Sequence, residues 1–186
     1  SSGTNIGFYF NGGDYNNVTN NTIYTGVNGG ASNYGFYIVS TSIYNIVENN
    51  FVNTSGTSSN YGVYITGATD RDNKIWGNVI RSGGSSSDNY GLRLVGGNTS
   101  LVNNTIYTGG TSSNYGVYFV GADWSNVTNN TIYTGGSSSN NYGINFASTS
   151  VKNVIDFNFI NTSGTSNNYG IYLSATTEDN NRFLNN

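Results

Sequence analysis

Apolar residues recur along the chain in a short alternating pattern that repeats seven times. In each copy, two large apolar residues lie two positions apart, directly after a glycine. A period of two is typical of a β-strand with one buried face. The pairs are Phe8/Phe10, Phe36/Ile38, Val63/Ile65, Leu92/Leu94, Val117/Phe119, Ile144/Phe146 and Ile171/Leu173. The pattern therefore predicts seven equivalent strands in an all-β fold.

A second motif contains an aliphatic residue, an asparagine three positions later, and another aliphatic residue two positions after that. It reads Val18-Asn21-Ile23, Val47-Asn50-Val52, Ile75-Asn78-Ile80, Leu101-Asn104-Ile106, Val127-Asn130-Ile132 and Ile155-Asn158-Ile160. The two aliphatic residues are five positions apart, an odd number, so the alternation of inward and outward side chains must be interrupted once between them. This predicts a tight corner at the asparagine, with both aliphatic side chains pointing inward. Stacked corner amides can hydrogen-bond to one another and to the backbone. We therefore predict a structural asparagine ladder of Asn21, Asn50, Asn78, Asn104, Asn130 and Asn158.

Both motifs recur with one long period. A Tyr-Gly pair precedes the apolar pair at Tyr34, Tyr61, Tyr90, Tyr115, Tyr142 and Tyr169, with Ile6-Gly7 as a variant, and successive glycines are 25 to 29 residues apart. Such a period indicates a solenoid, in which each unit buries its apolar face against its neighbours. We expect one domain over residues 1–186, with rungs near 5–33, 34–60, 61–89, 90–114, 115–141, 142–168 and 169–186.

The spacings inside the two motifs stay constant, whereas the connections between them vary in length. This pattern resembles the right-handed parallel β-helix repeat of pectin-lyase-like proteins, in particular those of the surface-protein type. The resemblance implies about seven rungs of 25–29 residues, stacked about 4.8 Å apart. It leaves function open, because the scaffold hosts lyases, hydrolases, tailspikes, adhesins and passive fibres.

Composition narrows the classes of partner. Six basic and nine acidic residues give a net charge of −3, so a nucleic acid partner is not expected. No apolar run approaches the ~18 residues of a membrane span. The chain has no Cys and no His, and we expect no cofactor. Because the repeat begins and ends partway through a unit, with Ser1–Asn5 resembling the loop before a Tyr-Gly pair, we expect a piece of a longer repeat protein.

Alternation places one column of side chains on the outer surface of the first strand. It consists of Tyr9, Tyr37, Tyr64, Arg93, Tyr118, Asn145 and Tyr172. Three interpretations remain open: a ladder that stabilises the sheet, a contact with another protein, or stacking on sugar rings, with Arg93 in a cation–π arrangement. The tyrosine of each Tyr-Gly pair is expected to pack inward or against the corner. The glycine beside it is expected to permit a positive φ or close packing.

Acidic residues gather in the variable loop before the second motif, at Asp14, Asp70, Asp72, Asp123, Glu178 and Asp179. We interpret them as solvated charges. Loops two turns apart lie about 9 to 10 Å from each other, too far for a retaining glycosidase and at the upper limit for an inverting one. Asp70 and Asp72 are the only candidate metal ligands, for Ca²⁺ together with carbonyl oxygens.

Eight sequons for N-glycosylation occur, a number that chance explains in a chain so rich in Asn, Ser and Thr. Their asparagines are Asn17, Asn20, Asn53, Asn98, Asn103, Asn126, Asn129 and Asn161. Asn20, Asn103 and Asn129 directly precede a corner asparagine and should face outward. They would be usable acceptors in a secreted protein.

The residues favour a structural role over catalysis. The Asn-Thr-Asp, Asp-Asp and His-Gly motifs of polygalacturonase-like enzymes are missing, and only Asp70, Arg71, Asp72 and Lys74 resemble the Ca²⁺-and-base arrangement of pectate lyases. We therefore expect a non-catalytic structural module of an extracellular or cell-surface protein or filament, which self-associates or continues into further repeats. The alternative is a carbohydrate-binding or carbohydrate-active domain of the lyase or hydrolase kind. An ice-binding face would need a regular outward Thr-X-Thr array, which is missing.

Overall fold

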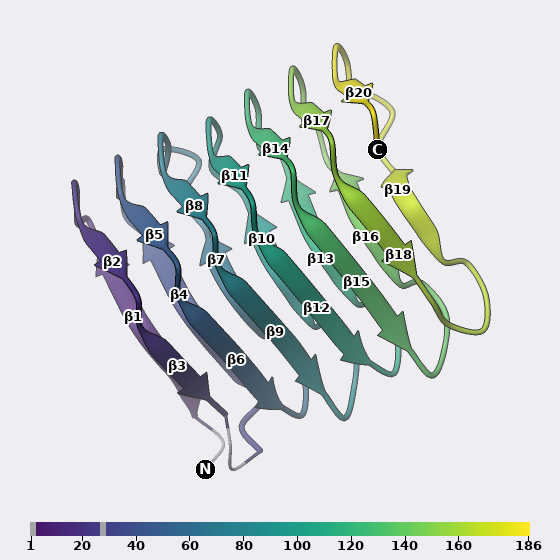
Figure 1. The fold of residues 1–186 in the computed structure, drawn as a ribbon, viewed down its shortest axis with the longest axis horizontal. Coiled ribbons are helices and arrows are strands. Elements are labelled where there is room, and N and C mark those ends of the chain that lie inside the picture. The colour runs from purple at the N-terminus through teal and green to yellow at the C-terminus, as the bar shows by residue number, and fades with distance from the viewer. Residues whose placement is uncertain (1–2, 27–28) are drawn as a thin grey trace.

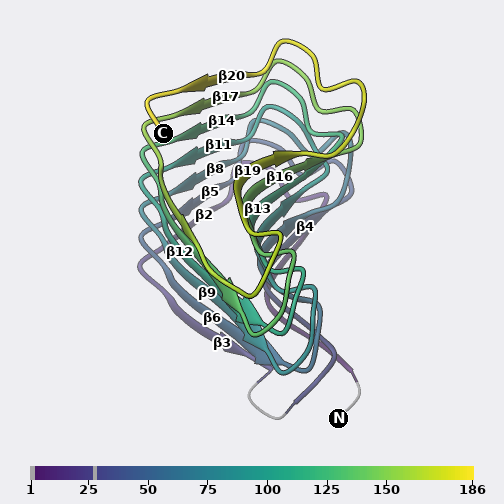
Figure 2. The same cartoon turned by 90° about the vertical axis from the view of Figure 1, so that its right-hand side faces the viewer.

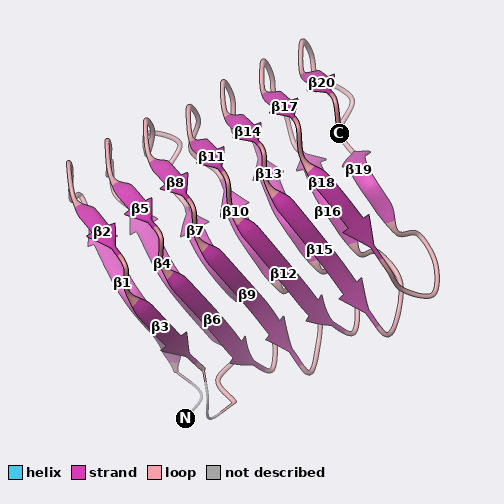
Figure 3. Cartoon of the chain, in the orientation of Figure 1, coloured by secondary structure: helices cyan, strands magenta, loops and turns pink. Residues whose placement is uncertain are grey.

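The computed structural model describes residues 3–26 and 29–186, and this part of the chain contains strands and turns but no helix (Figures 1 and 3). The strands form three all-parallel sheets with seven, seven and six members. The chain is therefore a parallel β-solenoid of about six turns, consistent with the right-handed form. The predicted all-β repeat fold is confirmed. The seventh rung is a partial turn, because its third strand is missing from the described residues. Ser1 and Ser2 of the expected first loop lie outside them.

The first sheet holds the strands that follow the Tyr-Gly pairs and the variant Ile6-Gly7. In spatial order it contains β1 (Thr4–Asn11), β4 (Ser32–Val39), β7 (Asn60–Ile65), β10 (Tyr90–Leu94), β13 (Tyr115–Val120), β16 (Tyr142–Ala147) and β19 (Tyr169–Leu173). Equivalent residues pair across the sheet, as with Phe36 and Val63. This register stacks each repeat position into a column along the rod.

The two halves of the asparagine motif form the other two sheets. The second sheet contains β2 (Asn17–Thr19), β5 (Ile46–Glu48), β8 (Lys74–Trp76), β11 (Ser100–Val102), β14 (Asn126–Thr128), β17 (Val154–Asp156) and β20 (Arg182–Leu184). The third contains β3 (Thr22–Thr25), β6 (Phe51–Gly56), β9 (Val79–Gly84), β12 (Thr105–Gly110), β15 (Thr131–Gly136) and β18 (Phe159–Thr162). Seen from the end, the turns stack behind one another around one shared interior (Figure 2).

The interior is filled by the apolar residues of the two motifs. In the second turn, Phe36 and Ile38 from the first sheet, Val47 from the second and Val52 from the third are all fully buried. The equivalent residues of the other turns belong to the same continuous core cluster. Each turn contributes only a few apolar side chains to the core. These side chains are buried by the turns stacked on either side of them, and not by other residues of their own turn.

Three corners join the strands of each turn, and all three use the same local device. In most turns, a residue with positive φ is followed at once by an inward-pointing polar side chain that bonds to a neighbouring turn; Asn5 and Asn33 lack the positive-φ residue, and the Thr99 hydroxyl lacks a partner in the described residues. At the predicted corner, Asn103 has φ 56° and Asn104 is buried. Short polar residues and glycine tolerate this left-handed conformation best, which explains the Asn-Asn pairs in the sequence.

The predicted asparagine ladder is confirmed and extends to Asn186. Asn104 is typical: its Nδ2 donates to Oδ1 of Asn130 at 3.0 Å and to the carbonyl oxygen of Ile75 at 2.9 Å, and its backbone N–H donates to the same Oδ1 at 2.9 Å. Buried amides are therefore paired, which removes the cost of leaving them unsatisfied.

Two further ladders were not predicted. One runs without a break at the corner before the first sheet, through Asn5, Asn33, Asn60, Asn89, Asn114, Asn141 and Asn168. The other lies between the first and second sheets, at Asn16, Asn45, Asn73, Thr99, Ser125, Asn153 and Asn181. It is interrupted between Asn73 and Thr99, where the Thr99 hydroxyl has no partner in the described residues, and backbone N–H groups are the donors at Thr99 and Ser125. Polar side chains thus link successive turns at all three corners, with this one interruption.

The tyrosine of the Tyr-Gly pair lies outside the sheet, so the expectation that it packs inward is wrong. Gly35 and Phe36 both point inward, which shifts the alternation by one residue and turns Tyr34 outward. A Cβ on Gly35 would lie 2.5 Å from the carbonyl oxygen of Gly62. The glycine is therefore required for close packing, and it has no positive φ.

Candidate functional site

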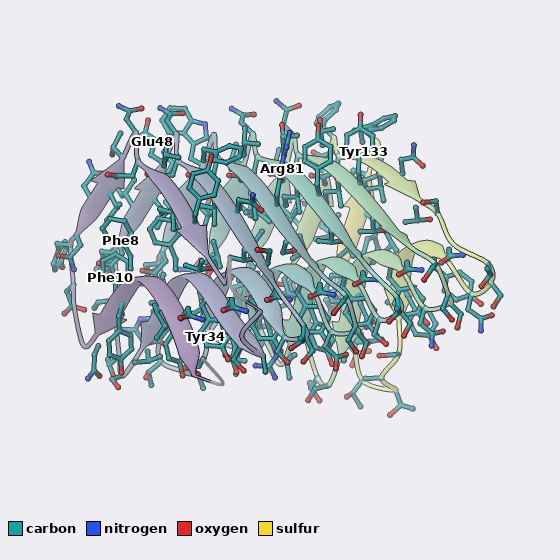
Figure 4. All side chains as sticks on the ribbon, turned by 90° about the horizontal axis from the view of Figure 1, so that it is seen from below. Phe8, Phe10, Tyr34, Glu48, Arg81 and Tyr133 are labelled. Atoms are coloured by element: carbon teal, nitrogen blue, oxygen red, sulfur yellow. The ribbon has the colours of Figure 1, made fainter. Side chains whose placement is uncertain are left out.

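The predicted outer column of the first sheet is one half of a double tyrosine array. Its partner column consists of the outward tyrosines of the Tyr-Gly pairs, Tyr34, Tyr61, Tyr90, Tyr115, Tyr142 and Tyr169. The two columns touch, with ring centroids 5.1 Å apart for Tyr34 and Tyr37. Phe8 and Phe10 lie between the sheets while Tyr34 lies on the outer side (Figure 4).

Successive tyrosine rings stack face to face over part of each column. Tyr90 stacks on Tyr61 and on Tyr115 with both centroid distances 4.9 Å, and Tyr37 stacks on Tyr9 at 5.4 Å and on Tyr64 at 5.3 Å. Neighbouring turns thus occupy both faces of the inner rings. The array presents ring edges and hydroxyl groups, which favours the sheet-stabilising interpretation over stacking on sugars.

Burial in the array changes the acidity of its hydroxyl groups. Desolvation raises the pKa of Tyr61 and of Tyr115 to about 12. The pKa of Tyr90 is raised further, first by burial and then by the Asp88 carboxylate that accepts its hydrogen bond at 3.1 Å. These three hydroxyl groups therefore stay protonated and uncharged at neutral pH.

Two positions of the predicted column depart from tyrosine. The guanidinium of Arg93 lies 4.8 Å from the ring centre of Tyr64 and 5.9 Å from that of Tyr118, which confirms the expected cation–π arrangement. Arg93 also donates a hydrogen bond to the Tyr64 hydroxyl. Asn145 is buried and leaves room for Tyr172, which packs against Tyr142 instead at 4.8 Å.

Several of the acidic side chains hold turns in place by accepting hydrogen bonds from backbone N–H groups. Asp70 is 0% exposed and accepts hydrogen bonds from the backbone N–H groups of Ser42 and Gly67, both at 2.7 Å. Asp14 and Asp123 accept from Ile43 at 2.9 Å and Val151 at 2.8 Å, one turn further on. The interpretation as solvated charges is therefore wrong for Asp70, whose carboxylate holds a turn in place.

The proposed Ca²⁺ pair is not assembled. Asp72 uses one oxygen for Asn98 and the other for Nε of Arg71, while both oxygens of Asp70 bind backbone amides. No group of three acidic, histidine or cysteine side chains that could hold a metal ion occurs in residues 3–26 and 29–186. Ligands for a calcium ion would have to leave existing hydrogen bonds.

The sequon asparagines lie on the surface, as expected for Asn20, Asn103 and Asn129. Seven of the eight are exposed and Asn53 is half-buried. Two of them use their amide nitrogen internally: Asn98 donates to Asp72, and Asn129 donates to Asn103 at 2.7 Å. Asn103 and Asn129 occupy adjacent turns, so glycans on both would crowd each other.

The sequence pattern did not lead us to predict a second aromatic face, which lies on the third sheet. Tyr107 and Tyr133 stack at 5.1 Å, Arg81 lies over Tyr107, and two hollows of about 370 and 300 Å³ share Tyr107 and Thr108. Arg81 and Tyr133 point away from the interior in Figure 4. The recurring sequence Tyr-Thr-Gly-Gly was the available signal.

We also did not predict a notch between the third, fourth and fifth turns. It encloses about 310 Å³ and is lined by Ala68, Arg71, Gly97, Asn98, Gly121, Asp123 and Trp124. These residues belong to the connections from the first to the second sheet in the third, fourth and fifth turns. The unequal lengths of those connections were visible in the sequence, but which side chains meet there was not.

Comparison with family models, with curated proteins and with solved structures finds no match for this chain. The class of protein, a parallel β-solenoid with amide ladders at its corners, thus rests on the structure itself. Membership of the pectin-lyase-like superfamily remains a resemblance. In the part of the chain that the structure describes, there is no helix that could span a membrane.

Proposed function

We propose that this chain is a non-catalytic structural module of an extracellular surface protein or filament, in which stacked turns form a rigid rod. The observation that carries the proposal is the set of hydrogen-bonded ladders at all three corners. Two corners carry side-chain hydrogen bonds between successive turns along the whole rod, the third corner carries them except between Asn73 and Thr99, and parallel sheets join the turns on all three sides. Bending such a rod would stretch bonds at one corner or another.

The ladders also give the rod a direction. Along the corner that begins the third sheet, each asparagine donates from Nδ2 to the Oδ1 of the asparagine one turn closer to the C-terminus, as Asn50 does to Asn78 at 3.1 Å. The same donor–acceptor pattern repeats at every step. A further turn, from the same polypeptide or from another copy, would join through the same bonds. This polarity favours end-to-end growth into a fibre over closed rings.

A catalytic role has little support from the side chains. The chain has no His and no Cys, and the acidic residues of the turns are engaged by backbone amides. Burial raises the pKa of Tyr61 and Tyr115 to about 12, so these two hydroxyl groups keep their protons. Within residues 3–26 and 29–186, we find no nucleophile with an adjacent base of the kind that hydrolases and lyases use.

Electron microscopy and fibre diffraction of the purified protein test the proposal. We expect straight rods of uniform width and a meridional reflection near about 4.8 Å, the spacing of stacked strands. Compact particles without elongation at all concentrations would contradict a filament role. Degradation of polysaccharides by the same preparation would contradict the non-catalytic assignment.

A further inference from the structure

The notch owes its shape to connections of unequal length. The connection in the third turn spans residues 66–73, whereas those of the fourth and fifth turns span only 95–99 and 121–125. The longer loop and Trp124 therefore form two walls, with Gly97 and Asn98 as the floor between them. At about 310 Å³, the space is at the small end of ligand sites.

The walls of the notch are held rigidly. Buried Asp70 fixes the long loop by accepting hydrogen bonds from Gly67 within the loop and from Ser42 of the preceding turn, both at 2.7 Å. Asp123 is fixed from the other side by the backbone N–H of Val151 at 2.8 Å. A preformed cavity costs a ligand little ordering free energy.

Burial in the core does not explain why Trp124 is a tryptophan. It is 60% exposed, so its burial contributes little, and it has φ 59°, a conformation that a bulky side chain adopts only at a cost. Tyr15 and Tyr44 occupy the same column but stack on each other at 5.0 Å. An exposed, conformationally strained indole in a cavity is typical of a contact surface rather than of a core.

Trp124 lines the notch together with Gly97 and Asn98 of the fourth turn. Lys152, one turn toward the C-terminus, places Nζ 4.2 Å from the ring centre and so covers one face of the ring. Because Lys152 lies on the C-terminal side and Gly97 and Asn98 lie one turn toward the N-terminus, the other face of the ring is the one that borders the notch. Unlike the inner rings of the tyrosine array, this ring can stack on a ligand.

The polar groups around the Trp124 ring indicate which class of ligand would fit the notch. Arg71 supplies a donor, with its side chain 60% exposed, and Asp123 supplies an acceptor, since its Oδ2 accepts no hydrogen bond within the described residues. Arg71 and Lys152 disfavour a cation, and Asp72 and Asp123 disfavour an anion. A purely apolar ligand would leave the donors and acceptors unpaired. A flat-sided molecule with many hydroxyl groups meets all of these conditions.

We propose that the notch around Trp124 binds a single pyranose ring of a glycan, with a sugar face stacked on the indole and hydroxyl groups bonded to Arg71 and Asp123. The assignment is independent of filament formation. It places the glycan contact on the turns rather than on the tyrosine array.

Tryptophan fluorescence tests the proposal, because the chain has only two tryptophans, Trp76 and Trp124. In a Trp76→Phe variant, Trp124 is the sole reporter. The probes are the methyl pyranosides of glucose, galactose, mannose and N-acetylglucosamine, and glucuronic acid. We expect at least one to change the emission saturably, with a dissociation constant on the order of 1 mM for so small a contact.

Two variants separate binding from folding. Ala68 is exposed on the long loop, so Ala68→Tyr should fill the notch without disturbing the core, and it should abolish the response while the circular dichroism spectrum stays unchanged. Trp124→Phe, which leaves Trp76 as the reporter, should show no response. Absence of a saturable change with every probe, or an equal change in the Ala68→Tyr variant, would overturn the proposal.

Discussion

Left-handed backbone conformations at the corners explain many of the residue choices in this chain. Five of the seven residues that directly precede a ladder asparagine are themselves asparagines, with φ between 48° and 60°: Asn20, Asn49, Asn103, Asn129 and Asn185. The short amide tolerates this conformation because it hydrogen-bonds locally and has little steric bulk. Gly77 meets the same demand by lacking a Cβ. One position does not follow this chemistry.

Phe157 occupies that position in the sixth turn with φ 53° while 58% of it is exposed. We expect Phe157→Asn to raise the free energy of unfolding by about 1 kcal/mol, because asparagine relieves left-handed strain and little apolar burial is lost. Urea denaturation measures the change. Phe159→Asn is the matched control, since Phe159 is equally exposed but lies in the extended strand β18. Equal effects of the two substitutions would refute the role of backbone strain.

At the scale of elements, the corner ladders connect strands that lie far apart in sequence. Each ladder asparagine forms hydrogen bonds with polar groups in the turn before it and in the turn after it. Replacing one asparagine therefore removes hydrogen bonds from three turns. Asn104 accepts from the backbone N–H of Asn78 at 2.9 Å and from its Nδ2 at 3.0 Å, and donates to three oxygens. Thr99, by contrast, has a buried hydroxyl without a partner in the described chain.

Asn104→Ala should therefore lower the free energy of unfolding by about 3 kcal/mol, because the buried N–H of Asn78 loses its acceptor. Chemical denaturation with circular dichroism detection gives the value. Asn103→Gly, one residue away, changes an exposed side chain and preserves the positive φ, so it should cost less than about 1 kcal/mol. If both substitutions lowered the free energy of unfolding by a similar amount, the hydrogen bonds of the ladder would contribute no more to stability than the exposed corner residue does.

At the scale of the whole molecule, the double tyrosine array forms a stripe along the rod, interrupted in its outer column by Arg93 and Asn145. Burial raises the pKa of Tyr61 and Tyr115 from 10.0 to about 12 in the folded protein. An unfolded chain releases these protons near pH 10, earlier than the folded chain does. The stabilisation from keeping them protonated is present below pH 10 and is lost as the pH rises toward about 12.

We thus expect the free energy of unfolding to fall between pH 10 and about 12, with phenolate absorbance appearing as the protein unfolds. Denaturant titrations at several pH values in this window measure the slope. Tyr90→Phe keeps the stacked ring but removes a hydroxyl whose pKa is strongly raised by burial and by Asp88, so its slope should be shallower. A flat pH profile would contradict the buried state of the array.

The repeat pattern by itself determined the parallel solenoid, its buried strand faces and the ladder from Asn21 to Asn158. These features depend on spacing within about six residues and on a constant period, both of which a sequence displays directly. The other two ladders and the outward position of Tyr34 were decided by tertiary structure. Gly35 changes the alternation, and the side chains at the other two corners take their partners from adjacent turns.

The burial of Asp70 and the notch at Trp124 depend on contacts still less visible in the sequence. Residues from three successive turns meet there because one connection is longer than its neighbours. Local spacing specifies how each turn is built. Which side chains of neighbouring turns form a common surface is decided only by the stacked structure. Such side chains are 25 residues or more apart in the sequence and come together only when the turns stack.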